Sequence, residues 1–258
     1  MAAIVLTQAL PRAKALAQQI RDAGFEPVRL SFQQLEPIEA ATNRLAGLRI
    51  SDDDRLVFVS PSAVHFAQPV LARLAQWCPH GMAVVGPGTE AALRASCPGL
   101  EPIRPAQPPF DADALTALPA MQAGAFGTLV VLRGEQGRDD WIEAFRAAGK
   151  QVEVFELYRR LDVQPDTAMQ AAIARLASRA EPALLMVGSV GQAERLAQWS
   201  VAAGLAQWLR RQPCLVSHPR VASRLLAHGF TTMLDAPPGL SMLTAAIQWA
   251  QNSSAASS

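Results

Sequence analysis

The stretch AIVLTQALPRAKALAQQIRDAGFEPVRL (residues 3–30) is echoed by the stretch TLVVLRGEQGRDDWIEAFRAAGKQVE (residues 128–153). Each begins with a short apolar run, continues through an arginine, Arg12 or Arg138, and ends its helical pattern at an Ala-Gly pair. The two arginines are 126 residues apart and the two glycines 125. A supersecondary unit that recurs at a nearly fixed offset indicates an internal duplication.

Two further pairs of segments keep the same order and nearly the same offset. FVSPSAV (residues 58–64) resembles MVGSV (186–190), and AVVGPGTEAAL (83–93) resembles CLVSHPRVASRL (214–225). Matched segments in one order predict two similar domains and therefore a cleft between them.

Short apolar runs alternate with longer stretches of helical period, which is typical of a parallel sheet covered by helices. Gly24 and Gly149 each follow such a helical stretch and are expected to end it. The predicted fold class is therefore α/β. The strand candidates are Ala3–Thr7, Pro27–Ser31, Arg55–Val59, Met82–Val85, Thr128–Leu132, Gln151–Tyr158, Ala183–Val187, Pro213–Val216 and Thr231–Leu234.

The order of the matched segments predicts interleaved domains. One domain comprises residues 1–34 together with 163–258, and the other comprises residues 38–157. The chain is expected to cross near residues 35–38 and again near 157–162, as a double hinge that restricts twisting but permits opening and closing.

Composition excludes several classes of function. The chain has 258 residues, 50% of them hydrophobic, with 23 basic and 22 acidic residues and no run of like charge. Neither nucleic-acid binding nor a membrane surface is therefore expected. The sequence has no signal-peptide or membrane-span pattern, and three cysteines without a CxxC spacing suit a reducing compartment, so we predict a cytoplasmic protein. The four scattered histidines show no ligand spacing, and no metal is predicted.

The predicted carboxyl ends of the strands are rich in hydroxyl side chains. Ligands bind at this edge of an open parallel sheet, beside helix N-termini that favour anions. Serine and threonine are also preferred helix N-caps, and each could have only that role. The residues concerned are Thr7, Ser60, Ser62, Thr89, Ser189 and Ser217.

Three arginines lie near the same loops, namely Arg133, Arg138 and Arg220. They are candidates for carboxylate recognition, and the alternative is a solvated arginine or an ion pair with Glu135 or Asp139. Tyr158, the single tyrosine, lies beside the second crossing. Its phenol could donate a proton to a leaving hydroxyl, or could simply pack at a domain junction.

Four segments resemble motifs of the uroporphyrinogen-III synthase family over nearly the whole chain. VFVSPSAV (residues 57–64) is similar to "FTSxxAV", VGPGTEAAL (85–93) to "VGxxTAxAL", LRGEQGR (132–138) to "LRGxxGR", and residues 158–160 match "YRR". Their order and spacing together are more specific than any one motif.

The resemblance implies two flavodoxin-like domains with interleaved connectivity, joined by a two-stranded linker, with the cleft between them. It implies a cofactor-free enzyme of haem biosynthesis, a hydro-lyase that cyclises hydroxymethylbilane to uroporphyrinogen III. A monomer is expected on separate grounds, because no long amphipathic seam suggests an obligate dimer. Ring D is inverted through a spiro intermediate, and transient contact with the preceding deaminase is possible. Such a substrate carries eight carboxylates, which suits hydroxyl-rich and anion-friendly helix starts.

By the same resemblance, Tyr158 and Thr89 match the most sensitive positions of the family. Tyr158 is expected to assist departure of the hydroxyl and Thr89 to orient the substrate. Other matched or nearby positions are expected to bind substrate: Ser60, Ser62, Arg133, Arg138, Ser189, Ser217 and Arg220. The chain departs from the family where SHPRVA (217–222) replaces "IGxTTA", so Ser217 or Arg220 is expected to replace a missing threonine.

Two other functions fit parts of the sequence. A noncatalytic cytosolic protein could bind a small anionic ligand in a hinged cleft. A nucleotide-dependent oxidoreductase would need a GxGxxG fingerprint, which residues 86–91 give only in degraded form with Pro87 inside it.

Overall fold

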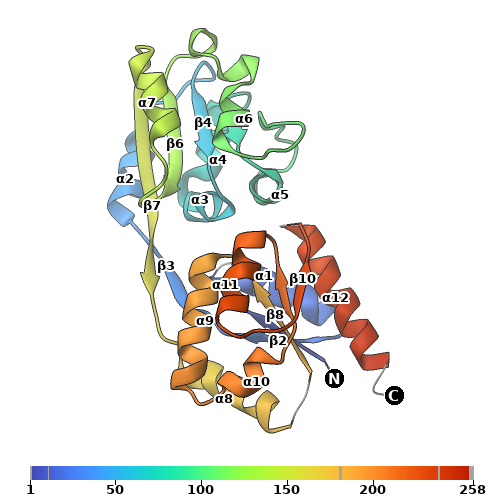
Figure 1. Ribbon diagram of the computed structural model, residues 1–258. Helices are drawn as coiled ribbons and strands as arrows, with labels where there is room; N and C mark the ends of the chain where they lie inside the picture. The colour runs from blue at the N-terminus through green and yellow to red at the C-terminus, as the bar shows by residue number, and fades with distance from the viewer. Residues whose placement is uncertain (1, 11, 180–181, 238, 256–258) are drawn as a thin grey trace. The chain divides into compact units, whose positions relative to one another are not determined.

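The computed structural model describes residues 2–10, 12–179, 182–237 and 239–255. The chain divides into two compact units (Figure 1): unit 1 is Met1–Gln34 with Leu161–Ser258, and unit 2 is Leu35–Arg160. Each unit contains one five-stranded sheet. Both sheets are mainly parallel, so the predicted α/β fold class is confirmed.

The sheet of unit 1 has the strand order β10-β9-β8-β1-β2. All neighbouring strands in it are parallel. Numbered along the chain, this order is 2-1-3-4-5 read from the other edge, which is the flavodoxin-like doubly wound arrangement. The strands are β1 (Ala3–Leu6), β2 (Glu26–Arg29), β8 (Ala183–Val187), β9 (Cys214–Val216) and β10 (Met233–Asp235).

Alternate residues of these strands enter two separate cores, because successive side chains of a strand point to opposite faces. Val5, Leu185 and Val216 pack with helices on one face of the sheet. Leu6 and Met186 pack with helices on the other. The first group of helices is α8 (Thr167–Ser178), α9 (Val190–Ala202), α10 (Ala206–Arg210) and α11 (Pro219–Ala227), and the second is α1 (Arg12–Asp22) and α12 (Leu240–Ala255).

The sheet of unit 2 has the order β3-β7-β6-β4-β5, and β7, β6, β4 and β5 are parallel to one another. The matched sequence segments occupy the same places in the two sheets: β6 corresponds to β1, β4 to β8, and β5 to β9. A parallel bridge from Ile103 to Ala83 takes the place of β10. The strands are β3 (Gln33–Pro37), β4 (Arg55–Phe58), β5 (Met82–Val84), β6 (Leu129–Gly134) and β7 (Val152–Asp162).

Helices cover both faces of this sheet as well. Phe58 and Leu132 pack with one group of unit 2 helices on one face of the sheet. Val57 and Val131 pack with a second group of unit 2 helices on the other face. The first group is α2 (Glu39–Gly47), α3 (Pro61–Phe66), α4 (Gln68–Trp77) and α5 (Pro87–Ser96). The second is α6 (Ala112–Thr116), the 3-10 turn η1 (Pro119–Met121) and α7 (Asp140–Ala147), and another 3-10 turn, η2 (Ala123–Ala125), follows η1.

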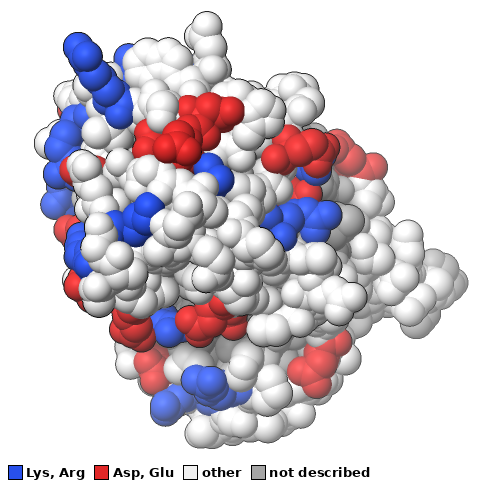
Figure 2. Space-filling model, turned by 90° about the horizontal axis from the view of Figure 1, so that it is seen from above, with Lys and Arg blue, Asp and Glu red and all other residues white. Residues whose placement is uncertain are grey.

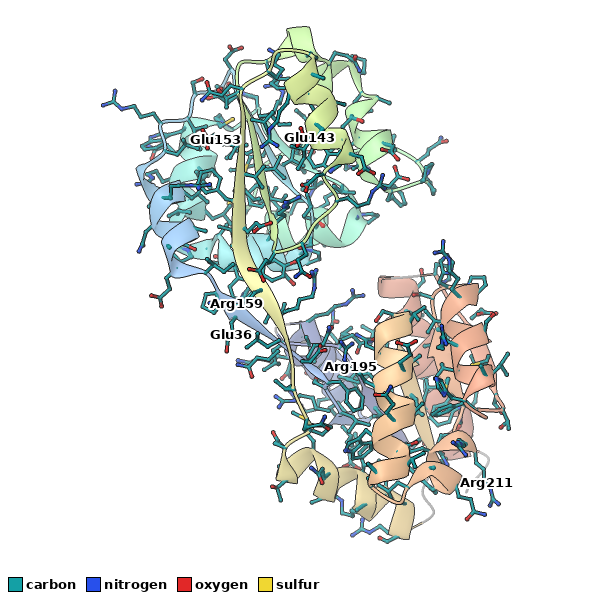
Figure 3. The ribbon with its side chains drawn as sticks, turned by 60° about the vertical axis from the view of Figure 1, so that its left-hand side comes forward. Glu36, Glu143, Glu153, Arg159, Arg195 and Arg211 are labelled. Atoms are coloured by element: carbon teal, nitrogen blue, oxygen red, sulfur yellow. The ribbon has the colours of Figure 1, made fainter. Side chains whose placement is uncertain are left out.

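The chain passes between the units along β3 and β7, which are neighbours in the second sheet. The amide of Ile38 donates to the carbonyl of Leu157, and the amide of Val163 donates to the carbonyl of Phe32. The paired residue numbers rise on one strand as they fall on the other, so the two segments run antiparallel. Glu36 and Arg159 lie on these strands with a nitrogen–oxygen distance of 3.9 Å (Figure 3).

Each predicted strand is present in the structure, most with ends within two residues of the predicted ones. The main difference is β7, which continues to Asp162 because it forms the second crossing as well as a sheet strand. Gly24 and Gly149 follow α1 and α7 with φ angles of +83° and +77°. This left-handed conformation favours glycine, which explains why both helices end there.

Candidate functional site

In unit 2, a serine caps the helix that follows β4. Ser60 accepts a hydrogen bond from the Ala63 amide at 3.1 Å and precedes Pro61, the first residue of α3. A serine at the N-cap satisfies an amide that the helix leaves without a partner, and proline suits the next position. Ser60 and Ser62 are both half-buried. The hydroxyl of Ser60 is thus fixed at the carboxyl edge of the sheet.

The phenol of Tyr158 contacts this same hydroxyl. The Ser60 and Tyr158 oxygens are 3.0 Å apart, and Tyr158 is only 1% exposed. Phe66, at the end of α3, stacks on the tyrosine ring with centroids 5.1 Å apart. An Nη of Arg160 lies 3.4 Å from the phenol oxygen, and the guanidinium carbon lies 5.5 Å from the ring centre. The structure thus joins two predicted site residues by one hydrogen bond.

A register shift in β7 aims Tyr158 at α3. Arg133 of β6 pairs with Glu156 of β7, but the next residue, Gly134, pairs with Tyr158, so β7 has one extra residue. Without this bulge, Tyr158 would share a face with Glu156. Instead it joins Leu157 and the core beneath α3.

The absence of a side chain at Gly134 makes room for the tyrosine ring. A Cβ at this position would lie 2.5 Å from Cζ of Tyr158 and 2.6 Å from Cε2. Glycine is therefore required where the backbone of β6 approaches the ring. The glycine of the LRGEQGR segment consequently has a packing function.

Thr89 lies in the first turn of α5, after β5. It is 4% exposed, and its amide donates to the carbonyl of Gly86, which is the N-cap residue. A Cβ at Gly88 would lie 3.7 Å from Pro61 Cγ, so the starts of α3 and α5 are in contact. Thr89 and Ser60 therefore belong to neighbouring helix starts on the same edge of the sheet.

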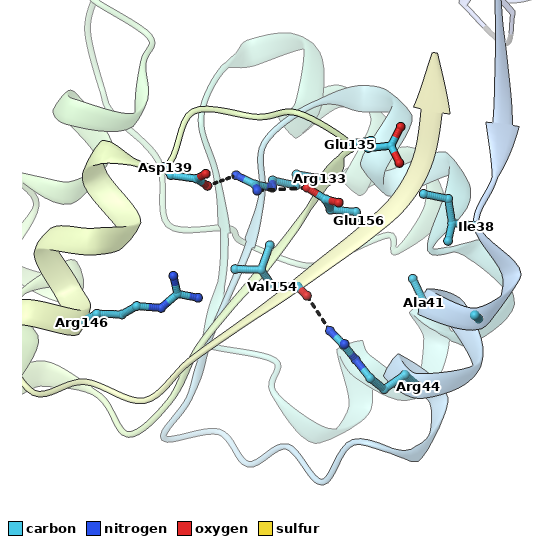
Figure 4. Close-up of a pocket in the computed structure, with 10 residues that line it drawn as sticks. Ile38, Ala41, Arg44, Arg133, Glu135, Asp139, Arg146, Val154 and Glu156 are labelled. Atoms are coloured by element: carbon cyan, nitrogen blue, oxygen red, sulfur yellow. Dashed lines mark hydrogen bonds and ion pairs between the residues drawn. The ribbon is translucent and has the colours of Figure 1, made fainter. Parts of the chain in front are cut away.

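Arg133 is committed to ion pairs (Figure 4). Its guanidinium lies 2.5 Å from Asp139 and 3.0 Å from Glu156, and the side chain is 9% exposed. It lines a concavity of about 630 Å³ in unit 2 together with Arg44 and Glu135. Of the two alternatives for Arg133, the geometry favours an ion pair with Asp139. Arg133 and Tyr158 enter opposite sides of the sheet, so the site does not join them.

Arg138 differs from Arg133 in being well exposed. Its guanidinium lies 3.2 Å from Asp140 and 4.0 Å from Asp113, and its side chain is 62% exposed. Solvent weakens such pairs, so this arginine can exchange its partners for a ligand carboxylate at small cost.

In unit 1, Ser189 caps α9 and accepts from the Gln192 amide at 3.2 Å. Ser217 directly follows β9, but His218 is the N-cap of α11, and its Nδ1 accepts from the Arg220 amide at 3.1 Å. Thr7, at the end of β1, donates to the Met186 carbonyl at 2.7 Å. The carboxyl edge of this sheet is therefore also polar, with Ser189 and Arg220 exposed.

On the face shown in Figure 2, basic and acidic side chains form small mixed groups, and uncharged surface separates one group from the next. Among the residues that the structure describes, no group of three or more His, Cys, Asp or Glu side chains could hold a metal ion. None of the described helices is both long and apolar enough to cross a membrane.

The model of the family described as "Uroporphyrinogen-III synthase HemD" matches residues 14–241. The chain belongs to this family. The main functional prediction from the sequence, uroporphyrinogen-III synthase, is thereby confirmed, and nothing favours the noncatalytic alternative. Membership of the uroporphyrinogen-III synthase family makes this an enzyme of tetrapyrrole synthesis.

Solved structures of the same family resemble the chain over nearly its full length. Uroporphyrinogen-III synthetase from Helicobacter pylori is 13% identical, with 98% of this chain and 99% of that chain covered and a TM-score of 0.52. A mutant uroporphyrinogen III synthase from the extremely thermophilic bacterium Thermus thermophilus is 16% identical, with 98% of both chains covered and a TM-score of 0.49. At such identity, the first match shows the two-domain fold alone.

Three of the four family motifs contribute predicted site residues to one region of unit 2. The structure joins Ser60 of the first motif to Tyr158 of the crossing by a hydrogen bond, and Thr89 of the second motif lies in the neighbouring helix start. Arg133 is turned to the other face of its sheet. Sequence reasoning missed Phe66 and Arg160 as neighbours of the phenol. Phe66 is an aromatic residue that follows the cap serine in the sequence, and Arg160 is the last residue of the "YRR" motif. Their contacts with the phenol depend on the register shift in β7, which sequence spacing does not reveal.

Proposed function

We propose that this chain closes hydroxymethylbilane to uroporphyrinogen III, acting as a cyclising hydro-lyase that inverts ring D through a spiro intermediate. The family match over residues 14–241 supports the proposal. The observation that carries it is the hydrogen-bonded pair of Tyr158 and Ser60 at the carboxyl edge of a doubly wound sheet. Hydroxyl loss from the substrate needs a proton donor, and this pair supplies one without a metal.

In this proposal Tyr158 assists departure of the substrate hydroxyl. Because the phenol is 1% exposed, its proton reaches the leaving group through the half-buried Ser60. Thr89 orients the substrate by a hydrogen bond from the neighbouring helix start. The demand on acid strength is modest, since the enzyme mainly holds one conformer of a reactive intermediate.

The remaining site residues recognise the substrate carboxylates in this proposal. Ser62 and the exposed Arg138 act from unit 2, and Ser189, Ser217 and Arg220 act from unit 1. Charge-assisted bonds from arginine are the strong contacts for a carboxylate, and helix starts such as that of α9 add amide donors. Arg133 contributes through its ion pairs, which hold the loop before α7.

We also propose a monomeric cytoplasmic enzyme that receives its unstable substrate by transient contact with the preceding deaminase. The unpaired, buried Cys78 and Cys214 are compatible with a reducing compartment. Light scattering after gel filtration tests the monomer. Yield of the type III isomer with and without a bilane trap, in the presence of the deaminase, tests direct transfer.

The deciding experiment supplies freshly made hydroxymethylbilane, quenches the reaction, oxidises the products and separates the porphyrin isomers. We expect the type III isomer to exceed the spontaneous type I product. If folded protein yields only type I, the proposed activity is wrong, and the anionic-ligand alternative then becomes the reading to pursue.

A further inference from the structure

Two polar groups, the Ala63 amide and the Arg160 guanidinium, contact the Tyr158–Ser60 pair, and their chemistry fixes the direction of the hydrogen bond between the two hydroxyls. Ser60 Oγ accepts from the Ala63 amide at 3.1 Å and lies 3.0 Å from the phenol oxygen. Arg160 Nη2 lies 3.4 Å from the same phenol oxygen. Among the described residues, these two side chains are the polar contacts of the phenol.

An arginine has donors and no acceptor, so Arg160 can only donate to the phenol oxygen. The phenol proton then has one described acceptor, Ser60 Oγ. If the serine donated instead, the buried phenol proton would lack a partner, which is costly. The amide of Ala63 occupies the second lone pair of the serine oxygen. Both acceptor positions of Ser60 are thereby filled, and its own proton is left for a ligand.

We propose that Arg160 is a positioning residue that holds Tyr158 as the donor to Ser60, so that the Ser60 hydroxyl is the group that donates to the leaving oxygen of the substrate. This inference rests on the proposed function. The guanidinium acts twice, through its contact with the phenol oxygen and through its place 5.5 Å from the ring centre. Phe66 restrains the ring by stacking on it, at an interplanar angle of 21°.

The proton balance of the step is complete. The carbon–oxygen bond of the substrate hydroxymethyl group breaks, and the oxygen leaves as water with the Ser60 proton. The electron pair of the pyrrole nitrogen stabilises the carbon that remains. Ser60 recovers a proton from Tyr158, and the proton released from the pyrrole carbon on ring closure restores the phenol. Arg160 stays charged throughout and stabilises the phenol oxygen while its proton is away.

The test compares Arg160→Met with Arg160→Lys and with the neighbouring control Arg159→Met. Arg159 faces Glu36 at 3.9 Å. We expect Arg160→Met to lower kcat about fivefold with little change in KM, corresponding to one charge-assisted hydrogen bond. Arg160→Lys restores most of kcat because it keeps a charged donor, and Arg159→Met has no effect. In a Tyr158→Phe background, Arg160→Met should add nothing further.

A second readout does not depend on activity. The chain has one tyrosine, so the tyrosine doublet in its ultraviolet resonance Raman spectrum reports on Tyr158 alone. We expect a phenol that donates in the wild type, a weaker donor in Arg160→Met, and loss of the donor signature in Ser60→Ala. A phenol that only accepts, or a doublet unchanged by both substitutions, would overturn the inference even if the wild type makes the type III isomer. Failure to make type III would instead count against the proposed function.

Discussion

Ser60 of unit 2 and Ser189 of unit 1 occupy equivalent places, and they perform the same structural task with different neighbours. Each follows the strand at the same position of its sheet and has nearly the same backbone angles, −157° and 159° for Ser60 and −151° and 157° for Ser189. Each accepts from the amide three residues on, at 3.1 Å and 3.2 Å. The helix start requires this serine, so its presence in both copies says little about chemistry.

The difference lies in what else reaches the edge. In unit 1, the side-chain oxygen of Gln192 accepts from the amide of Gly188 at 2.9 Å. The single proton of the Thr7 hydroxyl is shared between that oxygen, at 3.0 Å, and the Met186 carbonyl, at 2.7 Å. In unit 2, a bulge brings Tyr158 to the serine and leaves one hydroxyl proton uncommitted. The duplicated scaffold thus supplies the cap serine in both units, whereas β7 of unit 2 alone adds the phenol of Tyr158.

The largest expected effect concerns the independence of the two cores. Leu6 and Leu132 are fully buried on β1 and β6, which are corresponding strands of the two sheets. We expect either leucine-to-alanine substitution to destabilise its own unit by roughly 2–5 kcal/mol through lost contacts and a cavity. Amide hydrogen exchange followed by mass spectrometry should show lost protection mainly in the substituted unit. Equal loss in both units would mean that the units unfold together.

The next effect comes from Gly134, where the backbone of β6 approaches the Tyr158 ring. We expect Gly134→Ala to destabilise unit 2 by roughly 1–3 kcal/mol, because the added methyl overlaps the Tyr158 ring. Turnover should fall as the phenol moves from Ser60. Gly47→Ala is the matched control, since a Cβ there meets nothing within 4 Å. Thermal denaturation and isomer analysis measure both effects, and a variant as stable and active as this control would contradict the packing argument.

The fold could be predicted largely from the sequence, for a physical reason. Buried parallel strands such as Ala183–Val187 are continuous apolar runs, and Gly24 and Gly149 mark helix ends where left-handed backbone is needed. These are local signals, and duplication repeats them in order. Family motifs then identified the positions of Ser60, Thr89 and Tyr158.

The arrangement of the site could be predicted only in part, because it depends on contacts between distant segments. Arg133 lies in a matched motif, yet its partners Asp139 and Glu156 are fixed by a strand register that local sequence does not reveal. The pairing of Ser60 with Tyr158, 98 residues away, depends on the bulge in β7. The contact of Arg160 with the phenol follows from the same geometry.

Alkaline pH offers a smaller effect that both units should share. Burial raises the pKa of the Cys214 thiol in unit 1 to about 12. Burial, followed by the nearby carboxylates of Asp52 and Asp54, raises the pKa of the Cys78 thiol in unit 2 to about 12. The unfolded thiols ionise at about pH 8.5. The contribution of these thiols to the free energy of unfolding is therefore fully present below that pH. It is lost as pH rises toward 12, because ionisation of the thiols stabilises only the unfolded state.

Urea denaturation at pH 8 and pH 9.5 measures this loss, which we expect to be about 1 kcal/mol per thiol. The variant with both Cys78→Ala and Cys214→Ala should be less stable at pH 8 than the wild type. Its free energy of unfolding should fall less between pH 8 and pH 9.5. The informative quantity is this pH difference, since the cavities left by alanine act equally at both values. A pH difference that the double variant leaves intact would assign the alkaline loss to other groups.

The smallest effect on stability is also the sharpest test of the comparison between the two cap serines. Ser60→Ala and Ser189→Ala should each cost about 1 kcal/mol, because each removes one helix cap. Their catalytic effects should differ: Ser60→Ala lowers kcat about tenfold through the lost donor, whereas Ser189→Ala raises KM through a lost substrate contact. Steady-state kinetics beside urea denaturation separates the two quantities. If the variants lose stability equally and kcat equally, the asymmetry between the copies is structural only, and the phenol of Tyr158 has no privileged partner.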